Sequence, residues 1–269
     1  MALRINTNAM SLTAHRNLGI NDRMLGKSLE KLSSGFRINR AGDDAAGLVK
    51  SESLRSEVRG LNQAVKNAED GISFVQTAEG ALNEIHSMLQ RMSELAVSAA
   101  NTATSDGTAE QAELAQLNEQ INQIGASTQF AGITVFDANP LTFHIGGNAG
   151  ENIAITVGAM SAADLGVDAV DLTTASGDAN AAITTIRTAI DTLSATRGSL
   201  GATQNRLEHT ITNLQVAGEN LTASESRIRD ADIAKEMVDF TRNQIMVQAG
   251  TSMLAQANQV PQSVLQLIR

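Results

Sequence analysis

A long apolar stripe with helical spacing constrains the fold more than any other feature of this sequence. Over residues 54–96, apolar side chains recur every three or four positions, and a second series overlaps the first on an adjacent face. Two apolar faces on one helix require neighbours on two sides, as in a helical bundle. A helix from Asp43 and Asp44, which can cap its amino end, to Asn101 would be roughly 85 Å long. We therefore expect a mainly α-helical, elongated coiled-coil or helical bundle.

The helical spacing is interrupted in the middle of the chain. After a break at residues 104–108, apolar residues between Leu114 and Ile124 indicate a shorter helix. The period then changes to two over 133–135, 141–145 and 153–157, which predicts short strands in a small β-hairpin region. Residues 158–180 are small, acidic and weakly patterned, so we expect an exposed connection there. Helical spacing returns at Ile183 and continues to Leu221.

Composition excludes several classes of function. The chain contains no Cys, Trp or Tyr, and its formal net charge is −9. Disulfide frameworks and thiolate metal sites are therefore excluded, and an acidic chain without a basic tract is a poor binder of nucleic acid. No apolar run approaches the ~20 residues that span a bilayer, so we expect no membrane insertion. The N-terminus shows no apolar secretory segment.

Motifs for catalysis or metal binding are not found in the sequence. The four histidines, His15, His86, His144 and His209, fall in different segments, and none belongs to an H-E-x-x-H motif. The glycine-bearing stretch at 145–151 lacks the lysine and the spacing of a phosphate-binding loop. We therefore predict no catalytic residue, no metal ligand and no cofactor, and hence no enzyme.

Each end of the chain carries an apolar stripe that resumes after a shift of register. These stripes define a predicted self-assembly core, made of Ile5, Ala9, Leu12, Leu18, Leu25, Leu32, Ile233, Met237, Phe240, Val247, Leu254, Leu265 and Ile268. One interpretation is that the two ends pair only with each other, as an antiparallel helical hairpin. The other is that this pair leaves an apolar face uncovered, which further copies bury. A contact repeated head to tail generally gives an open helical filament.

Several long motifs at both ends resemble bacterial flagellin. They are LSSGFRINRAGDDAAGL (32–48), SESLRSEVRGLNQAVKNAEDGISFVQTAEGAL (51–82), LGATQNRLEHTITNL (200–214), SESRIRDADIAKEM (224–237) and the ending ANQVPQSVLQLIR. The resemblance covers residues 1–140 and 180–269. It implies a subunit that polymerises into the extracellular filament of the bacterial flagellum, which serves swimming motility.

The resemblance also implies how the chain is divided. Residues 1–43, which include a linker, and 227–269 would form an inner coiled-coil domain. Residues 44–157, which include the β-hairpin, and 181–226 would form the helical bundle domain. Residues 158–180 would be a short variable connection where larger members carry outer domains. Flagellins leave the cell unfolded through the flagellar type III channel, so the implied partners are further copies, an export chaperone, the filament cap and hook–filament junction proteins.

A recognition surface is implied by the same resemblance. The stretch 89–101 is similar to the segment that the flagellin-sensing Toll-like receptor of vertebrates recognises, and the matching positions are Gln90, Arg91, Leu95 and Glu113. The alternative to this interpretation is that Leu95 belongs to an apolar interface. For the whole chain, the alternatives to a filament subunit are a hook–filament junction protein and a secreted coiled-coil effector that does not polymerise.

Overall fold

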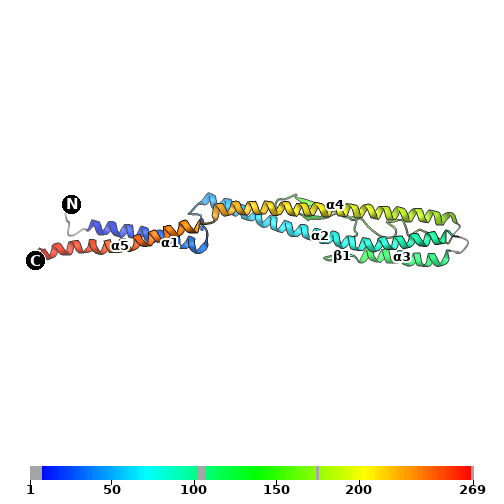
Figure 1. The fold of residues 1–269 in the computed structure, drawn as a ribbon, viewed down its shortest axis with the longest axis horizontal. Coiled ribbons are helices and arrows are strands. Elements are labelled where there is room, and N and C mark those ends of the chain that lie inside the picture. The colour runs from blue at the N-terminus through cyan, green and yellow to red at the C-terminus, as the bar shows by residue number, and fades with distance from the viewer. Residues whose placement is uncertain (1–7, 102–106, 174–175, 268–269) are drawn as a thin grey trace. The chain divides into compact units, whose positions relative to one another are not determined.

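The computed structural model describes residues 8–101, 107–173 and 176–267. Over these residues it has five helices and four short strands, which confirms the mainly α-helical fold with a small β region (Figure 1). The elements are α1 (Ala9–Ser34), α2 (Ala45–Ala99), α3 (Thr108–Ser127), β1 (Gln129–Phe130), β2 (Ile133–Thr134), β3 (Leu141–His144), β4 (Asn152–Ile155), α4 (Ser176–Arg229) and α5 (Ile233–Leu267).

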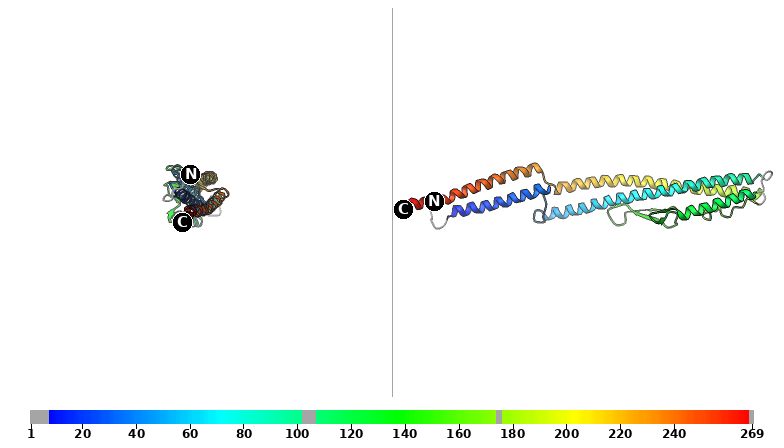
Figure 2. Two further views of the ribbon diagram at one scale, coloured as in Figure 1. Left: turned by 90° about the vertical axis from the view of Figure 1, so that its left-hand side faces the viewer. Right: turned by 90° about the horizontal axis from the view of Figure 1, so that it is seen from below.

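The chain forms two compact units. The first, here called the terminal unit, comprises Met1–Ser56 and Asn220–Arg269, and the second, the central unit, comprises Glu57–Glu219. In the terminal unit, α1 and α5 lie side by side, as Figures 1 and 2 show from different directions. In the central unit, residues 57–99 of α2 and 176–219 of α4 are accompanied by α3 and the strands.

Capping residues fix where the helices of the terminal unit begin. The Asn8 side chain accepts a hydrogen bond from the Ser11 amide at 3.1 Å, at the start of α1. The Asp232 carboxylate accepts one from the Lys235 amide at 3.2 Å, at the start of α5. Both side chains satisfy amide donors that have no partner within the helix. Helix α1 ends at Gly35, whose left-handed backbone (φ 74°) favours glycine.

The two aspartates before α2 have different roles. The Asp44 carboxylate accepts a hydrogen bond from the Gly47 amide at 2.8 Å, which confirms the predicted cap of α2. Asp43 does not cap this helix, so the prediction is wrong for that residue. Its Oδ2 atom instead accepts hydrogen bonds from the Asn39 and Arg40 amides, because the loop before α2 folds back over it.

The core of the central unit is made by α2, α3 and α4. Its largest fully buried side chains come from all three helices: Phe74, Leu82, Ile85, Leu89 and Met92 of α2, Leu114 and Ile121 of α3, and Ile186, Leu193 and Leu207 of α4. The two long helices run antiparallel here, because Arg197 of α4 contacts Glu79 of α2 at 3.5 Å and Leu207 lies against Gly71. The predicted two-sided apolar face of α2 is therefore confirmed.

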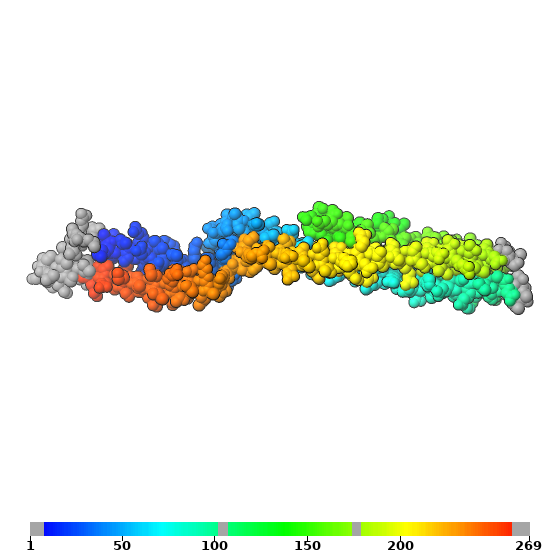
Figure 3. Space-filling view, turned by 45° about the horizontal axis from the view of Figure 1, so that its top comes forward, coloured from blue at the N-terminus to red at the C-terminus, as the bar shows by residue number. Residues whose placement is uncertain are grey.

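Two antiparallel hairpins pack on the central unit. Phe130 pairs with Ile133 between β1 and β2, and Leu141 pairs with Ile155 between β3 and β4. The Phe74 ring of α2 contacts the rings of Phe130 and Phe143, with centroids 6.0 and 5.8 Å apart. Figure 3 shows the green segment that contains the hairpins beside α4 in yellow. The predicted strands are confirmed, whereas β1 was not predicted from the sequence.

The prediction of an exposed connection is wrong for residues 158–173, here called the strap. Its apolar side chains are buried at intervals of two or three positions: Met160, Ala162, Leu165, Val167, Val170 and Leu172. Side-chain amides of α3 hold the strap backbone. Gln111 accepts from the Leu172 amide at 2.8 Å, and Asn122 accepts from the Ala162 amide at 2.8 Å. The strap is therefore part of the core.

Candidate self-assembly surface

An antiparallel pair of helices, α1 and α5, is the scaffold of the candidate surface. The Asn8 side chain donates a hydrogen bond to the Ala257 carbonyl at 2.8 Å, and Lys31 forms an ion pair with Glu236 at 3.6 Å. These two contacts lie at opposite ends of the pair and fix its register. Helices α1 and α5 therefore pair with each other, as both interpretations of the terminal stripes require.

Six of the thirteen predicted assembly residues form the seam between these two helices. These six are half-buried there: Leu18, Leu25, Leu32, Phe240, Val247 and Leu254. Gly250 allows a close approach, because a Cβ atom at this position would lie 3.2 Å from Leu18 Cδ1. The buried polar residues Ser28 and Asn243 also belong to this helix pair. The seam residues are thus covered by contact between α1 and α5 of the same chain.

Other predicted residues point away from the seam. Leu12 is 66% exposed, Ile233 48% and Met237 47%, and the small side chain of Ala9 is also exposed. Ile5 and Ile268 lie outside the described residues, and the side chain of Leu265 does too. The structure therefore divides the predicted core into an inner seam and an outer set of uncovered side chains.

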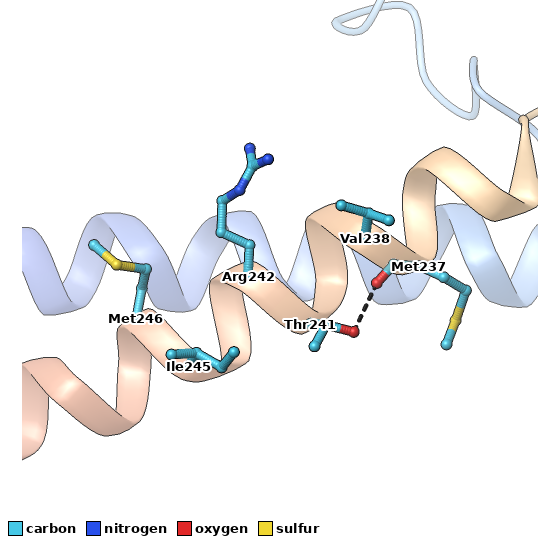
Figure 4. A pocket seen from close by; sticks show the side chains of 6 residues that line it. All are labelled: Met237, Val238, Thr241, Arg242, Ile245 and Met246. Carbon is cyan, nitrogen blue, oxygen red and sulfur yellow. Dashed lines mark hydrogen bonds between the residues drawn. The ribbon is translucent and has the colours of Figure 1, made fainter.

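The outer set is larger than the sequence pattern predicts. Among the side chains that the structure describes, the terminal helices expose eight further large apolar ones: Met10, Ile20, Met24, Leu29, Val238, Ile245, Met246 and Met253. Figure 4 shows part of this set on α5, where Met237, Val238, Ile245 and Met246 surround Thr241, with α1 behind. Leu29 was seen in the stripe of its helix, but the others lie off the stripes. The signal that could reveal them is the presence of apolar residues at every angle around α5.

A helix that carries apolar side chains on several sides is stabilised when neighbours cover each of those sides. Helix α5 contacts α1 through Phe240 and Val247 and exposes Val238 and Ile245 elsewhere on its surface. We name the outer surface formed by the exposed apolar side chains of α1 and α5 the outer apolar face. Clustered exposed apolar side chains, such as Met237, Val238, Ile245 and Met246, are typical of a site of protein association.

Loops close the terminal unit beside the ends of α1 and α5. The Arg37 amide donates to the Arg229 carbonyl at 2.7 Å, and the Ala231 amide donates to the Gly35 carbonyl at 2.9 Å. We call these paired segments, 35–37 and 229–231, the clasp. Arg55 reinforces it by an ion pair with Glu225 at 3.1 Å. The clasp ties the end of α1 to the break between α4 and α5.

The residues of the predicted recognition surface are only partly exposed. Arg91 of α2 forms a two-pronged ion pair with Glu113 of α3, with N–O distances of 2.7 and 3.2 Å. This hydrogen-bonded pairing raises the pKa of Arg91 and lowers the pKa of Glu113. Gln90 is exposed beside it, whereas Leu95 is only 5% exposed and belongs to the core. The structure thus brings Gln90, Arg91 and Glu113 to one surface and places Leu95 beneath it.

Among the residues that the structure describes, no group of three or more His, Cys, Asp or Glu side chains could hold a metal ion. No helix within the described ranges is both long and apolar enough to cross a membrane. The outer apolar face is therefore the strongest candidate for a functional surface.

Comparison with known proteins adds information about both ends of the chain. The model of the bacterial flagellin N-terminal helical region matches residues 5–140, and that of the C-terminal helical region matches residues 183–268. The chain is 51% identical over 271 residues to a flagellin of Halalkalibacterium halodurans, with 98% of this chain and 99% of the relative covered. It is 46% identical over 304 residues to a Bacillus subtilis flagellin, with 99% and 100% covered.

A spirochaete relative and a solved structure are similar as well. The flagellar filament 33 kDa core protein of Treponema phagedenis is 49% identical over 284 residues, with 98% of this chain and 99% of the relative covered. The crystal structure of Bacillus cereus flagellin is 26% identical, with a TM-score of 0.48, and covers 55% of this chain and 88% of the other.

Proposed function

The chain belongs to the bacterial flagellin family, and from that premise we propose that the outer apolar face is the surface through which it polymerises. As a flagellin, it is a structural subunit of the extracellular flagellar filament, a polymer of copies of itself. It is a short form, because only residues 141–182 separate the two matched regions and they hold the β3–β4 hairpin and the strap.

One observation supports this proposal above the others. Helix α5 carries apolar side chains on more than one side, and α1 covers the side that holds Phe240 and Val247. Exposed Val238 and Ile245 are stabilised only if something apolar covers them. Further copies of the same helix pair are the covering surface that a homopolymer supplies.

A pair of substitutions on α5 tests the outer apolar face. Ile245→Asp places a charge on a side chain that is 58% exposed, so we expect α1 and α5 to stay paired while elongation of filament seeds falls at least about tenfold. Gln244→Asp adds the same charge at the neighbouring position, which is already exposed and polar, and should have a much smaller effect. Seed elongation is followed by light scattering and electron microscopy. If both variants elongate seeds equally, the outer apolar face is not part of the assembly interface.

The same assay separates this function from its alternatives. A filament subunit elongates seeds without limit, whereas a hook–filament junction protein adds to the end and stops. A secreted effector that does not polymerise would keep its assembly state when residues 1–32 or 233–269 are deleted. We expect unlimited elongation by the intact chain and loss of elongation on either deletion. The family is structural rather than enzymatic, and no catalytic role is proposed.

Transport and partner proteins form a second part of the proposal. We infer that the chain is exported unfolded through the flagellar type III channel, with a chaperone before export and the cap and junction proteins at the filament. The absence of Cys supports this, because no disulfide can oppose unfolding. Secretion of the full chain in a strain with and without the export apparatus tests it: secretion that does not depend on the apparatus would contradict the proposal.

Recognition by the flagellin-sensing Toll-like receptor is proposed for the surface of Gln90, Arg91 and Glu113. The exposed, two-pronged Arg91–Glu113 pair supports it, because it presents charged groups in a fixed geometry. Leu95, being buried, would act by supporting this surface from within. In a receptor reporter assay, Arg91→Ala should weaken the response to monomer severalfold and Lys66→Ala should not. An unchanged response to the Arg91 variant would contradict the proposal.

A further inference from the structure

We propose that five exposed methionines of the terminal unit are oxidation sites of the free subunit, and that their sulfoxides exclude the subunit from the filament. The residues are Met10, Met24, Met237, Met246 and Met253. The reagent would be a two-electron oxidant of the peroxide or hypohalous acid class. This inference rests on the proposed role of the outer apolar face in assembly.

The methionines of the two units differ in their solvent exposure. The five in the terminal unit are exposed, at 47–63%. The three that the structure describes in the central unit are shielded: Met92 is 0% exposed, Met160 is 5% and Met88 is half-buried. Oxidation follows exposure, so an oxidant should attack the terminal unit first. Met1 lies outside the described residues.

Methionine thioethers are the sulfur groups of this chain that an oxidant can attack. With no Cys, there is no thiol to compete for oxidant, and Trp and Tyr are absent as well. In the reaction, a peroxide transfers one oxygen atom to the methionine Sδ atom and leaves as water. Sulfur loses two electrons, the peroxide gains them, and the new S–O bond replaces the O–O bond that breaks.

Oxidation converts an apolar contact into a strong hydrogen-bond acceptor. Met237 and Met246 share a hollow with Val238 and Ile245, which offer no donor from their side chains, and with Thr241 and Arg242 (Figure 4). Both polar side chains are already engaged, because the Thr241 hydroxyl donates to the Met237 carbonyl at 2.8 Å and Arg242 pairs with Asp239 at 3.4 Å. Met10, Met246 and Met253 line a second hollow between α1 and α5, together with Thr13, Asn17 and Asn21. A sulfoxide buried by an apolar surface of a neighbouring copy would lose its hydration, and Thr241 or Arg242 could replace it only by giving up a present contact.

A sorting experiment on the intact wild-type chain tests this inference. Monomer is oxidised to about one sulfoxide per chain with hydrogen peroxide, added to filament seeds, and separated by sedimentation into assembled and free fractions. Peptide mass spectrometry then gives the sulfoxide content at each methionine. We expect sulfoxide at the five sites to be at least about fivefold depleted in the assembled fraction. Equal content in both fractions would overturn the inference.

The same experiment distinguishes failure of the inference from failure of the proposed function. If untreated monomer does not elongate seeds, the assembly function itself is wrong. If untreated monomer elongates them and oxidised monomer joins equally well, only the oxidation inference is lost. Treatment of oxidised monomer with both methionine sulfoxide reductases should restore elongation, because sulfoxide formation is reversible. Failure of fully reduced protein to recover would assign the inhibition to another lesion.

Two sets of leucine substitutions locate the sensitive positions. One variant carries leucine at the five exposed sites, and its matched control carries leucine at Met88, Met92 and Met160. Each variant is compared with its own untreated sample, so a change in its intrinsic elongation rate does not matter. We expect the control to lose elongation on oxidation as the wild type does and the five-site variant to resist. A five-site variant that stays sensitive would overturn the inference, and if it cannot elongate at all the sorting experiment decides.

Discussion

The guanidinium carbon of Arg229 lies 4.9 Å from the centre of the Phe36 ring. The guanidinium carbon of Arg55 lies 5.9 Å from the same ring centre, so two cations lie close to one aromatic ring at the clasp. Arg229 also forms an ion pair with Glu52 at 2.5 Å. A half-buried phenylalanine therefore organises the charges that tie α1 to the break between α4 and α5.

Replacing Phe36 should loosen the clasp. Phe36→Leu keeps an apolar side chain but removes the aromatic ring, and we expect a loss of about 1 kcal/mol in local stability. Hydrogen exchange should become faster at the Arg37 and Ala231 amides, which donate across the clasp. Phe36→Tyr retains the ring and should exchange nearly as slowly as wild type. Unchanged exchange in the leucine variant would show that the ring contributes nothing to the clasp.

The hydrogen bonds between the Gln111 side chain and the strap backbone predict that replacing Gln111 destabilises the strap. Gln111→Ala leaves the Leu172 amide and the Val170 carbonyl without their side-chain partner, which should cost about 1–3 kcal/mol. We expect faster hydrogen exchange across 160–172 and a lower urea midpoint. Gln120→Ala, at an exposed position on the same helix, is the matched control. If both variants behave alike, the amide does not hold the strap.

Glycines of the central unit should respond in opposite directions to alanine. Gly107 has a left-handed backbone (φ 76°), and a Cβ atom there would collide with the Leu172 carbonyl oxygen, so Gly107→Ala should destabilise by about 1–3 kcal/mol. Gly198 lies within α4, and no other part of the chain lies within 4 Å of the place that a Cβ atom would occupy, so Gly198→Ala should stabilise by about 0.5–1 kcal/mol. Thermal unfolding measures both, and a stabilising Gly107→Ala would contradict the left-handed backbone at Gly107.

Acid should loosen the loop before α2. Hydrogen bonds to the Asp43 carboxylate, chiefly from the Arg40 amide and also from Asn39 and Lys27, hold its pKa below the ordinary value of 3.8. A lowered pKa means that the stabilisation is complete above pH 3.8 and is lost as the pH falls through the folded-state pKa. The Arg40 amide signal in NMR spectra should report this transition. Asp43→Asn should abolish it, and persistence in that variant would assign the transition to another group.

Helices were predictable because their apolar residues repeat over many turns. The stripe through Leu82 and Leu89 sets the face of α2, and the Asp44 cap sets its start. The hairpins were predictable from the alternation that ends in Ile153 and Ile155. Strand β1 has two residues, of which only Phe130 is apolar, so it shows no alternation of its own.

The strap and the part of the outer apolar face that lies off the stripes could not be predicted from spacing, for different reasons. Buried strap residues are spaced alternately by two and three positions, as Met160, Ala162, Leu165 and Val167 show, so neither a helical nor a strand period describes them. Met246 and Ile245 lie outside the stripe of their helix, and a search for one apolar face discards them. Whether the apolar side chains of a helix are covered by the rest of its own chain depends on the tertiary structure, which the local spacing of apolar residues does not determine.

The anchoring of the strap limits where this subunit can accept foreign sequence. A peptide inserted at Met160 or Leu172 would pull a buried side chain away from α3, whereas Asp168 and Ala169 are exposed between the anchor points. The turn at Asn148–Gly150 is exposed as well. An epitope grafted at either of these two places would be repeated at every position of the polymer, which makes the short form a candidate scaffold for multivalent antigen display.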